Sequence, residues 1–344
     1  MLLNASRATP YNLETKVGNT PRVAPARPRP VIIDTDLSFD DYVALLYLLQ
    51  HPDIDVRAIT VANGVVHVKP GTENVRRLLV LTGRAAVPFA AGPEKPLMGQ
   101  HAFPAHWRYF LDYAPRLMLS RHSLPPLPEM SAAELICQEI AASETPVSFV
   151  ALGPLTNLAL ALRADPTLAA RLDRVLISGG TFHMPGTIHD DVPSHPNVVA
   201  EWNLYMDPLA ADIVFGSGAR LELVPLDVTH TGGTRSLLFT REFVRRLSAL
   251  AHRPAAKALV RIVHVWQLLN PRQEAVPVWD AAAAAIAADR AIGRSWRDLA
   301  IRVALEPKDV AGQTIVDENG PPNARVCFAG DQAAFEQAYL AIIG

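Results

Sequence analysis

Four aspartates lie within eight residues near the start of the chain, at Asp34, Asp36, Asp40 and Asp41. They follow an apolar run typical of a β-strand and precede an apolar run typical of a helix. Carboxylates this close repel one another unless positive charge lies between them. A hard divalent cation held by oxygen ligands removes that repulsion, so the spacing predicts a cation site.

The same spacing predicts where these carboxylates lie. Asp34 and Asp36 are two apart in a strand and therefore share one of its faces. Asp40 and Asp41 fall at the start of a helix, where free N–H groups and the helix dipole favour negative charge. All four gather at the carboxyl end of one strand, where open α/β sheets build their sites. The structural alternative, an Asp-rich turn that caps a helix, rarely needs more than one acid.

Two later segments add candidate oxygen ligands. The run Leu152-Gly153-Pro154 ends a strand in a tight turn before a helix; either it exposes a backbone carbonyl to the cation or it is an ordinary βα turn. Asp280 stands before an alanine-rich helix. It serves either as the N-cap of that helix or as a fifth oxygen ligand.

A third segment has the residue types for sugar binding. Glu201 and Asn203 are two apart, so on an extended segment both side chains face one way. An acid beside an amide suits the adjacent hydroxyls of a sugar. The alternative is a surface strand that enters a helix at Asp207, where Asp-Pro is a good N-cap and N1 pair.

Alternating strand-like and helix-like runs must position these groups. Strands are expected at 31–36, 56–62, 147–152, 174–178 and 221–225, and helices at 42–50, 73–81, 155–162, 207–215 and 281–289. This order predicts an α/β fold with a mostly parallel, Rossmann-like central sheet flanked by helices, and the site at the carboxyl ends of its strands. Residues 1–30 are expected to form a Pro- and Arg-rich tail, and 31–344 a single catalytic domain.

Two segments interrupt this alternation, and a third is expected to cover the site. Residues 93–128 and 181–200 are expected to be long loops, which in a compact domain are usually either functional or disordered. Residues 239–270 are expected to form one or two amphipathic helices over the site.

Bulk composition excludes several classes of function. The 344 residues are 49% hydrophobic, carry a net charge of −2 and contain no basic block, so a nucleic acid is not the expected partner. No apolar run reaches membrane-spanning length. The first 30 residues lack the apolar segment of a secretory signal, and a cytoplasmic location is expected. The two cysteines lie far apart and imply no disulfide framework.

Together these motifs resemble those of the nucleoside hydrolase family. The resemblance rests on Asp34-Thr35-Asp36 with Asp40-Asp41, on 152–157, on 177–180, on Ala200-Glu201-Trp202-Asn203 and on Asp280, in consistent order over roughly residues 31 to 340. The family implies an α/β fold, one bound Ca²⁺, and hydrolysis of the N-glycosidic bond of small-molecule ribonucleosides to base and ribose. A homodimer and a homotetramer both remain open.

The resemblance also implies roles for individual residues. It makes Asp36 both a calcium ligand and the general base, and it completes the ligand set with Asp41, the Leu152 carbonyl and Asp280. Asp40 and Asn203 would hold ribose hydroxyls, Glu201 would reach the far side of the sugar, and Asp34 would orient the other carboxylates from behind.

Two tryptophans point to one branch of the family. Trp279 stands where the inosine–uridine-preferring branch has a histidine, and Trp107 lies in a segment similar to one of the purine-specific inosine–adenosine–guanosine branch. Stacking of a purine between Trp107 and Trp279 is therefore expected, which suits purine salvage. For Trp107 the alternative is a loop aromatic that fills the core.

Three departures from the family pattern leave alternatives open. Leu37 replaces a usual glycine, Asn63-Gly64 replaces Gly-Asn, and the asparagine expected before Glu201 is absent or displaced to Asn197. Contacts to the ribose 5′ end, and a pyrimidine or modified nucleoside substrate, stay open. So does a Ca²⁺-dependent nucleoside or sugar binder without catalysis. A haloacid-dehalogenase-like phosphatase, whose signature also begins Asp-x-Asp, is a weaker alternative.

Overall fold

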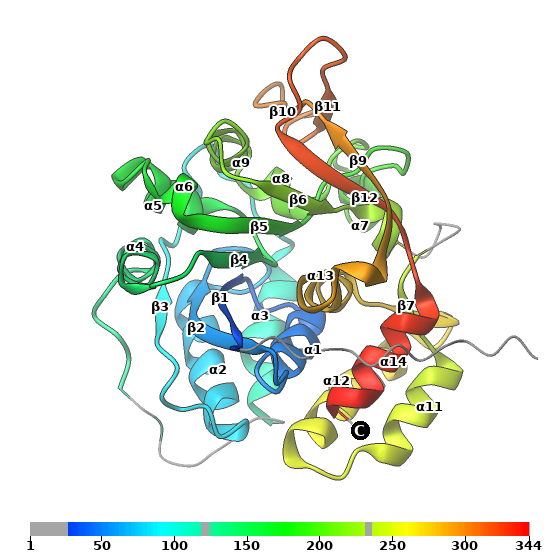
Figure 1. The fold of residues 1–344 in the computed structure, drawn as a ribbon. Helices are drawn as coiled ribbons and strands as arrows, with labels where there is room; N and C mark the ends of the chain where they lie inside the picture. The colour runs from blue at the N-terminus through cyan, green and yellow to red at the C-terminus, as the bar shows by residue number, and fades with distance from the viewer. Residues whose placement is uncertain (1–26, 118–123, 125, 231–235, 344) are drawn as a thin grey trace, which may run out of the picture.

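An eight-stranded sheet forms the centre of the chain in the computed structural model, which describes residues 27–117, 124, 126–230 and 236–343 (Figure 1). The strand order is β3-β2-β1-β4-β5-β6-β12-β9. The strands are β1 (Arg29–Thr35), β2 (Ile54–Val61), β3 (Phe89–Ala91), β4 (Val147–Ala151), β5 (Leu172–Ser178), β6 (Leu221–Val224), β9 (Gly293–Leu299) and β12 (Ala324–Gly330). All neighbouring pairs are parallel except β12 and β9.

The central strands are apolar on both faces because helices cover both. In β1, Ile33 faces one hydrophobic core and Ile32 the other, and both are fully buried. The first core includes α1 (Phe39–Leu48), α2 (Val68–Leu81), α12 (Pro254–Leu269), α13 (Trp279–Ala288) and α14 (Gln332–Ile343). The second includes α4 (Ala132–Ala142), α5 (Thr156–Ala164) and α9 (Pro208–Phe215).

The sheet reverses its order between β1 and β4. The chain moves outward from β1 to β2 and β3, then returns to place β4 on the other side of β1 and continues to β5 and β6. Loops at the carboxyl ends of β1 and β4 therefore diverge and leave a crevice between them, which is where sheets of this kind bind ligands. Asp36 follows β1 and Leu152 follows β4.

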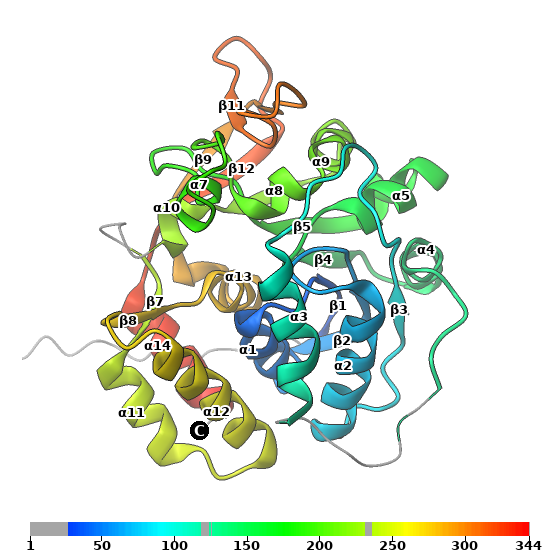
Figure 2. The same ribbon diagram turned by 180° about the vertical axis from the view of Figure 1, so that it is seen from behind.

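Further elements surround this core. Short helices lie in the connections between strands: α3 (Ala105–Tyr113), α6 (Leu168–Arg171), α7 (Ile188–Asp191), α8 (Trp202–Met206) and α10 (Leu226–Thr229). Helices α11 (Arg241–Leu250), α12 and α14 lie together at one end (Figure 2). The hairpin of β10 (Ile301–Val303) and β11 (Thr314–Val316) projects at the other end, and β7 (Leu238–Thr240) pairs with β8 (Ala275–Pro277). No helix in the described segments is long and apolar enough to span a membrane.

The predicted fold class is confirmed, with corrections to its elements. Helix α3 occupies part of the stretch 93–128 that was expected to be a loop, and β3, β9, β12 and α14 were not predicted. The stretch 239–270, predicted to form one or two helices, contains two, α11 and α12. Most of the predicted tail, residues 1–26, lies outside the described residues. Strand β1 begins at Arg29, within the range 1–30 that was predicted for the tail.

Candidate active site

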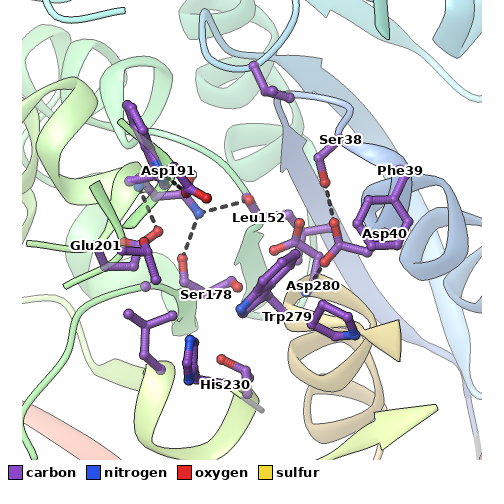
Figure 3. Close-up of a pocket in the computed structure, with 18 of the residues that line it drawn as sticks. Ser38, Phe39, Asp40, Leu152, Ser178, Asp191, Glu201, His230, Trp279 and Asp280 are labelled. Carbon is purple, nitrogen blue, oxygen red and sulfur yellow. Dashed lines mark hydrogen bonds between the residues drawn. The ribbon is translucent and has the colours of Figure 1, made fainter. Parts of the chain in front are cut away.

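A cavity of about 510 Å³ opens at the carboxyl edge of the sheet, beside the point where the strand order reverses. Its lining includes residues of the loops after β1, β2, β4 and β5, of β8, and of α1, α3, α7, α8, α10, α12 and α13. Figure 3 shows carboxylates, backbone carbonyls and aromatic rings converging on it. Of the predicted site residues, those that line the cavity are Asp36, Asp40, Trp107, Leu152, Glu201, Asn203, Trp279 and Asp280.

Asp36 is clamped between two glycines at the end of β1. A Cβ at Gly64 would lie 2.0 Å from the Asp36 Oδ2 atom, and one at Gly153 would lie 2.9 Å from its backbone nitrogen. The Val65 N–H donates to Oδ2 at 2.8 Å. Asp36 is 3% exposed, and burial, followed by the charge of Asp41, raises its pKa well above the ordinary value.

This packing explains two departures from the family pattern. The reversed Asn63-Gly64 pair puts the glycine against Asp36, and the side-chain amide oxygen of Asn63 (Oδ1) accepts from the Arg108 guanidinium at 2.6 Å. Leu37 has a φ of 57°, in the left-handed region that a glycine adopts at little cost. Its side chain is fully buried, and burial worth about 1.5–3 kcal/mol offsets the strain of about 1–2 kcal/mol.

The first turn of α1 supplies the next two carboxylates. Ser38 is the N-cap, and its N–H donates to Asp41 Oδ2 at 2.8 Å. The Thr35 hydroxyl donates to the other Asp41 oxygen, and the Ser38 hydroxyl donates to Asp40. The backbone N–H of Asp280 donates to Asp40 Oδ2 at 2.9 Å. Asp280 lies in the first turn of α13 behind the N-cap Val278, so the structural alternative, in which Asp280 is the N-cap of this helix, is wrong.

Asp40, Asp41 and Asp280 each offer a carboxylate oxygen, and these oxygens lie within 4.8 Å of one another. All three are buried, and burial raises their pKa values, that of Asp40 to about 7. No salt bridge between described residues includes them or Asp36. Buried, unpaired carboxylates with oxygen donors alone fit a hard divalent cation such as Ca²⁺ or Mg²⁺. Asp36 is beside this trio but is not part of it.

Asp34 lies behind the cavity, where it accepts hydrogen bonds from the Thr60 hydroxyl at 2.5 Å and the Asn157 amide at 2.8 Å. Burial raises its pKa to about 7. This position suits the predicted orienting role, and Asp34 is not among the residues that line the cavity.

Glu201 is the N-cap of α8 rather than part of an extended segment, which corrects the predicted local structure. Its carboxylate accepts from the N–H groups of Asn203 at 2.7 Å, Gly180 at 3.1 Å and Leu204 at 3.3 Å. Burial still raises its pKa to about 7. Backbone donors thus fix the carboxylate in one orientation at the cavity wall.

The Asn203 side chain also faces the cavity. Its amide nitrogen donates to the Leu152 carbonyl at 3.1 Å and to the Ser178 carbonyl at 3.0 Å (Figure 3). These two bonds commit both amide hydrogens, so Asn203 offers its amide oxygen to a ligand. The Leu152 carbonyl retains its second lone pair, which can bind a cation.

Aromatic rings form two groups in the lining. The α3–α8 wall consists of Phe103, Trp107 and Trp202. Phe103 stacks on Trp202 with ring centroids 4.2 Å apart, and Trp107 lies 6.5 Å from Trp202. Trp107 also packs against the core, so it is both a core residue and part of the cavity.

The α12–α13 wall consists of Trp266, Trp279 and Phe39, the last from the start of α1. Phe39 stacks on Trp266 at 5.7 Å and meets Trp279 edge-on at 6.2 Å. The indole N–H of Trp279 has no hydrogen-bond partner among the described residues. Trp279 therefore presents both a ring face and a donor.

The structure removes Asn197 from the candidate ligand contacts. Its side chain is fully buried, accepts from the Val199 and Ala200 N–H groups, and donates to the Lys308 and Ala311 carbonyls. It fixes the loop before α8 and is not part of the cavity lining. Asn197 was predicted from its position in the sequence alone. Sequence position does not reveal that its side chain is already hydrogen-bonded to backbone groups.

Other lining residues were not predicted. They are Ser38, Phe39, Phe103, Asp190, Asp191, Trp202, His230 and Trp266, among others. Trp202 lies inside the segment 200–203, and Asp190-Asp191 lies in the Asp-rich stretch 181–200, so those two segments carried a usable signal. The remaining lining residues lie on segments that are far apart in the sequence and are brought together only by the fold.

Comparisons with known proteins agree on one family. Residues 31–337 match the family model described as inosine-uridine preferring nucleoside hydrolase. A pyrimidine-specific ribonucleoside hydrolase RihA from Shewanella sp. (strain ANA-3) is 31% identical over 317 residues, which cover 89% of this chain and 93% of that protein.

Solved structures give the same family. The plant nucleoside hydrolase PpNRh1 superposes with a TM-score of 0.76 at 26% identity, over 92% of this chain and all of that one. An inosine-guanosine nucleoside hydrolase superposes with a TM-score of 0.73 at 28% identity, over 92% of this chain and 98% of the other. Relatives with pyrimidine and purine names both occur, so the predicted place in the purine branch is not supported by these comparisons.

Proposed function

Since this chain belongs to the nucleoside hydrolase family, which acts on ribonucleoside N-glycosidic bonds, we propose that it cleaves purine ribonucleosides with Asp36 as general base and Ca²⁺ as its cation. The observation that carries the proposal is the convergence of buried carboxylates in the crevice beside β1 and β4. Asp36 lies at its edge, and Glu201 and Asn203 lie on its wall.

The cation would be held by Asp41, Asp280, Asp36 and the Leu152 carbonyl, with Asp40 close enough to join them. When bound, it supplies a water of lowered pKa and an anchor for vicinal hydroxyls. A trio of buried acidic oxygens and an available carbonyl supports this ligand set.

The side chains divide the remaining tasks. Asp36 accepts the proton of the attacking water, and the two glycines and the Val65 N–H keep its carboxylate in place. Asp40 and the Asn203 amide oxygen accept from ribose hydroxyls, and Glu201 accepts from a hydroxyl on the far side of the sugar. Breaking the ribosyl–nitrogen bond passes through an oxocarbenium-like state, whose positive charge these carboxylates favour.

The base would stack on the aromatic walls. Trp107 and Trp279 both line the cavity, which supports a flat purine ring as the leaving group. Pyrimidine ribonucleosides are the second candidate, because the RihA relative bears a pyrimidine-specific name.

A panel assay tests the proposal. Inosine, adenosine, guanosine, uridine and cytidine are each incubated with the full chain, and free ribose is measured with and without a calcium chelator. We expect the fastest ribose release from a purine nucleoside, loss of release with chelator, and recovery on adding Ca²⁺. Faster release from uridine or cytidine would refute the purine preference, and chelator-resistant release would refute the cation.

A further inference from the structure

The cavity is far more acidic than binding one divalent cation requires. Its described lining contains six carboxylates and no lysine or arginine: Asp36, Asp40, Asp190, Asp191, Glu201 and Asp280. Asp36, Asp40 and Asp280 lie at or beside the proposed cation site. The other three carboxylates are not ligands in that proposal, and the two exposed ones, Asp190 and Asp191, leave excess negative charge in the cavity.

One of these extra carboxylates, Asp191, contacts the α3–α8 wall, and a second, Asp190, is its neighbour in the chain. Asp190 and Asp191 end the short helix α7, and both remain exposed. The Trp202 indole N–H donates to Asp191 Oδ2 at 2.7 Å, and Trp202 lies 6.5 Å from Trp107. A ring that stacks on this wall would therefore meet negative charge at its edge and indole faces on its plane. Both attract a cationic ring.

The leaving group gives a second, chemical reason. A neutral nucleoside expels an anionic base unless an acid protonates that base. The cavity wall beside the expected base position carries the indole of Trp279, which is not an acid. A riboside whose base already carries a fixed positive charge leaves as a neutral molecule. It therefore needs no acid from the protein.

We propose that this cavity also selects ribonucleosides with a cationic base, such as N7-alkylated purine or N3-alkylated cytosine ribosides. This inference rests on the proposed hydrolase function. In the reaction, the bond between C1′ and nitrogen breaks and its electron pair neutralises the base. A water oxygen bonds to C1′, and the water proton passes to Asp36 and then to solvent. Water is the sole co-reactant.

Two matched substrate pairs test the inference: guanosine with N7-methylguanosine, and cytidine with N3-methylcytidine. In mildly acidic buffer, which keeps N1 of N7-methylguanosine and the exocyclic nitrogen of N3-methylcytidine protonated, the members of each pair differ by one methyl group and one positive charge. The two pairs cover both base classes. The ratio of kcat/KM for the cationic member to that for the neutral member is measured with the full chain and Ca²⁺. The intrinsic reactivity of each substrate cancels when this ratio is compared between variants.

Asp190→Asn removes one charge, Asp190→Glu keeps it, and Glu318→Gln removes one exposed charge far along the chain, outside the cavity lining. We expect Asp190→Asn to lower the cation-to-neutral ratio about threefold to fivefold. Asp190→Glu and Glu318→Gln should leave the ratio within about twofold of the wild type.

The outcomes separate this inference from the proposed function. An unchanged ratio in Asp190→Asn would overturn the selection, as would a wild type that cleaves neutral nucleosides but not their cationic partners. No base release from any of the four substrates would overturn the proposed hydrolase function itself.

Discussion

Replacing Gly64 by alanine tests whether Asp36 must keep its position. The new Cβ would lie 2.0 Å from Asp36 Oδ2 and 2.6 Å from its Cγ, whereas real Cβ contacts lie beyond 3.0 Å. The Asp36 carboxylate must therefore move by about 1 Å, and it would strain its hydrogen bond from the Val65 N–H. A displacement of about 1 Å at a reacting group costs about 100-fold in rate, or about 2.7 kcal/mol of barrier.

The assay measures kcat for ribose release at saturating nucleoside and Ca²⁺, with folding checked by circular dichroism and thermal melting. Gly216→Ala is the matched control, since the nearest atom to its added Cβ is the Asp212 carbonyl oxygen at 3.3 Å. We expect about a 100-fold loss for Gly64→Ala and less than about a twofold loss for Gly216→Ala. A folded Gly64→Ala enzyme with kcat within about threefold of the wild type would refute the reasoning.

Three further predictions concern the base, the sugar and the cation. Trp279→Ala should raise the free-energy barrier that kcat/KM reports for purine nucleosides by about 1–3 kcal/mol. The barrier for nitrophenyl riboside, which has an activated leaving group, should rise by less. Equal rises for both substrates would make Trp279 purely structural. Nucleoside 5′-phosphates should react about 100-fold more slowly than nucleosides or worse, because the described lining has six carboxylates and no lysine or arginine; comparable rates would show that the acidic lining is not selective. The pKa values of Asp34 and Asp40 are raised to about 7 in the fold, so the folded state binds more protons than the unfolded state. The free energy of unfolding of protein freed of cation by a chelator should then fall as pH rises from about 5 to about 8, and added Ca²⁺ should suppress that fall. Melting curves that do not change with pH would contradict the raised pKa values of these carboxyl groups.

Sequence predicts the acidic cluster well because its parts are local. Asp36, Asp40 and Asp41 are fixed by one strand end and one helix start, so spacing alone brings them together. The alternation of strands and helices likewise predicts the parallel sheet. Glu201, Asn203 and Asp280 lie on other segments. Residue type gave each of them a site role beside a structural alternative, and the resemblance to family motifs favoured the site role.

The rest depends on contacts that spacing does not specify. Strand β12 pairs with β6 across about a hundred residues of chain, and Phe39 meets Trp266 from another helix. The Gly64 contact with Asp36 follows from tertiary packing, as does the burial of Asn197 among backbone groups. Short-range pattern predicts which residues carry chemistry, whereas packing decides which of them face the cavity.

The central claim is that Asp36, at the edge of the carboxylate cluster, drives attack of water on the ribosyl carbon. Its most direct test compares wild type and Asp36→Ala, both verified as folded, for release of base and sugar in phosphate-free buffer and after adding phosphate. We predict base and free ribose in equal amounts from the wild type, no dependence on phosphate, and a loss of at least about 1,000-fold in Asp36→Ala. Near-normal turnover by Asp36→Ala, or sugar released as a phosphate ester in place of ribose, would contradict the account.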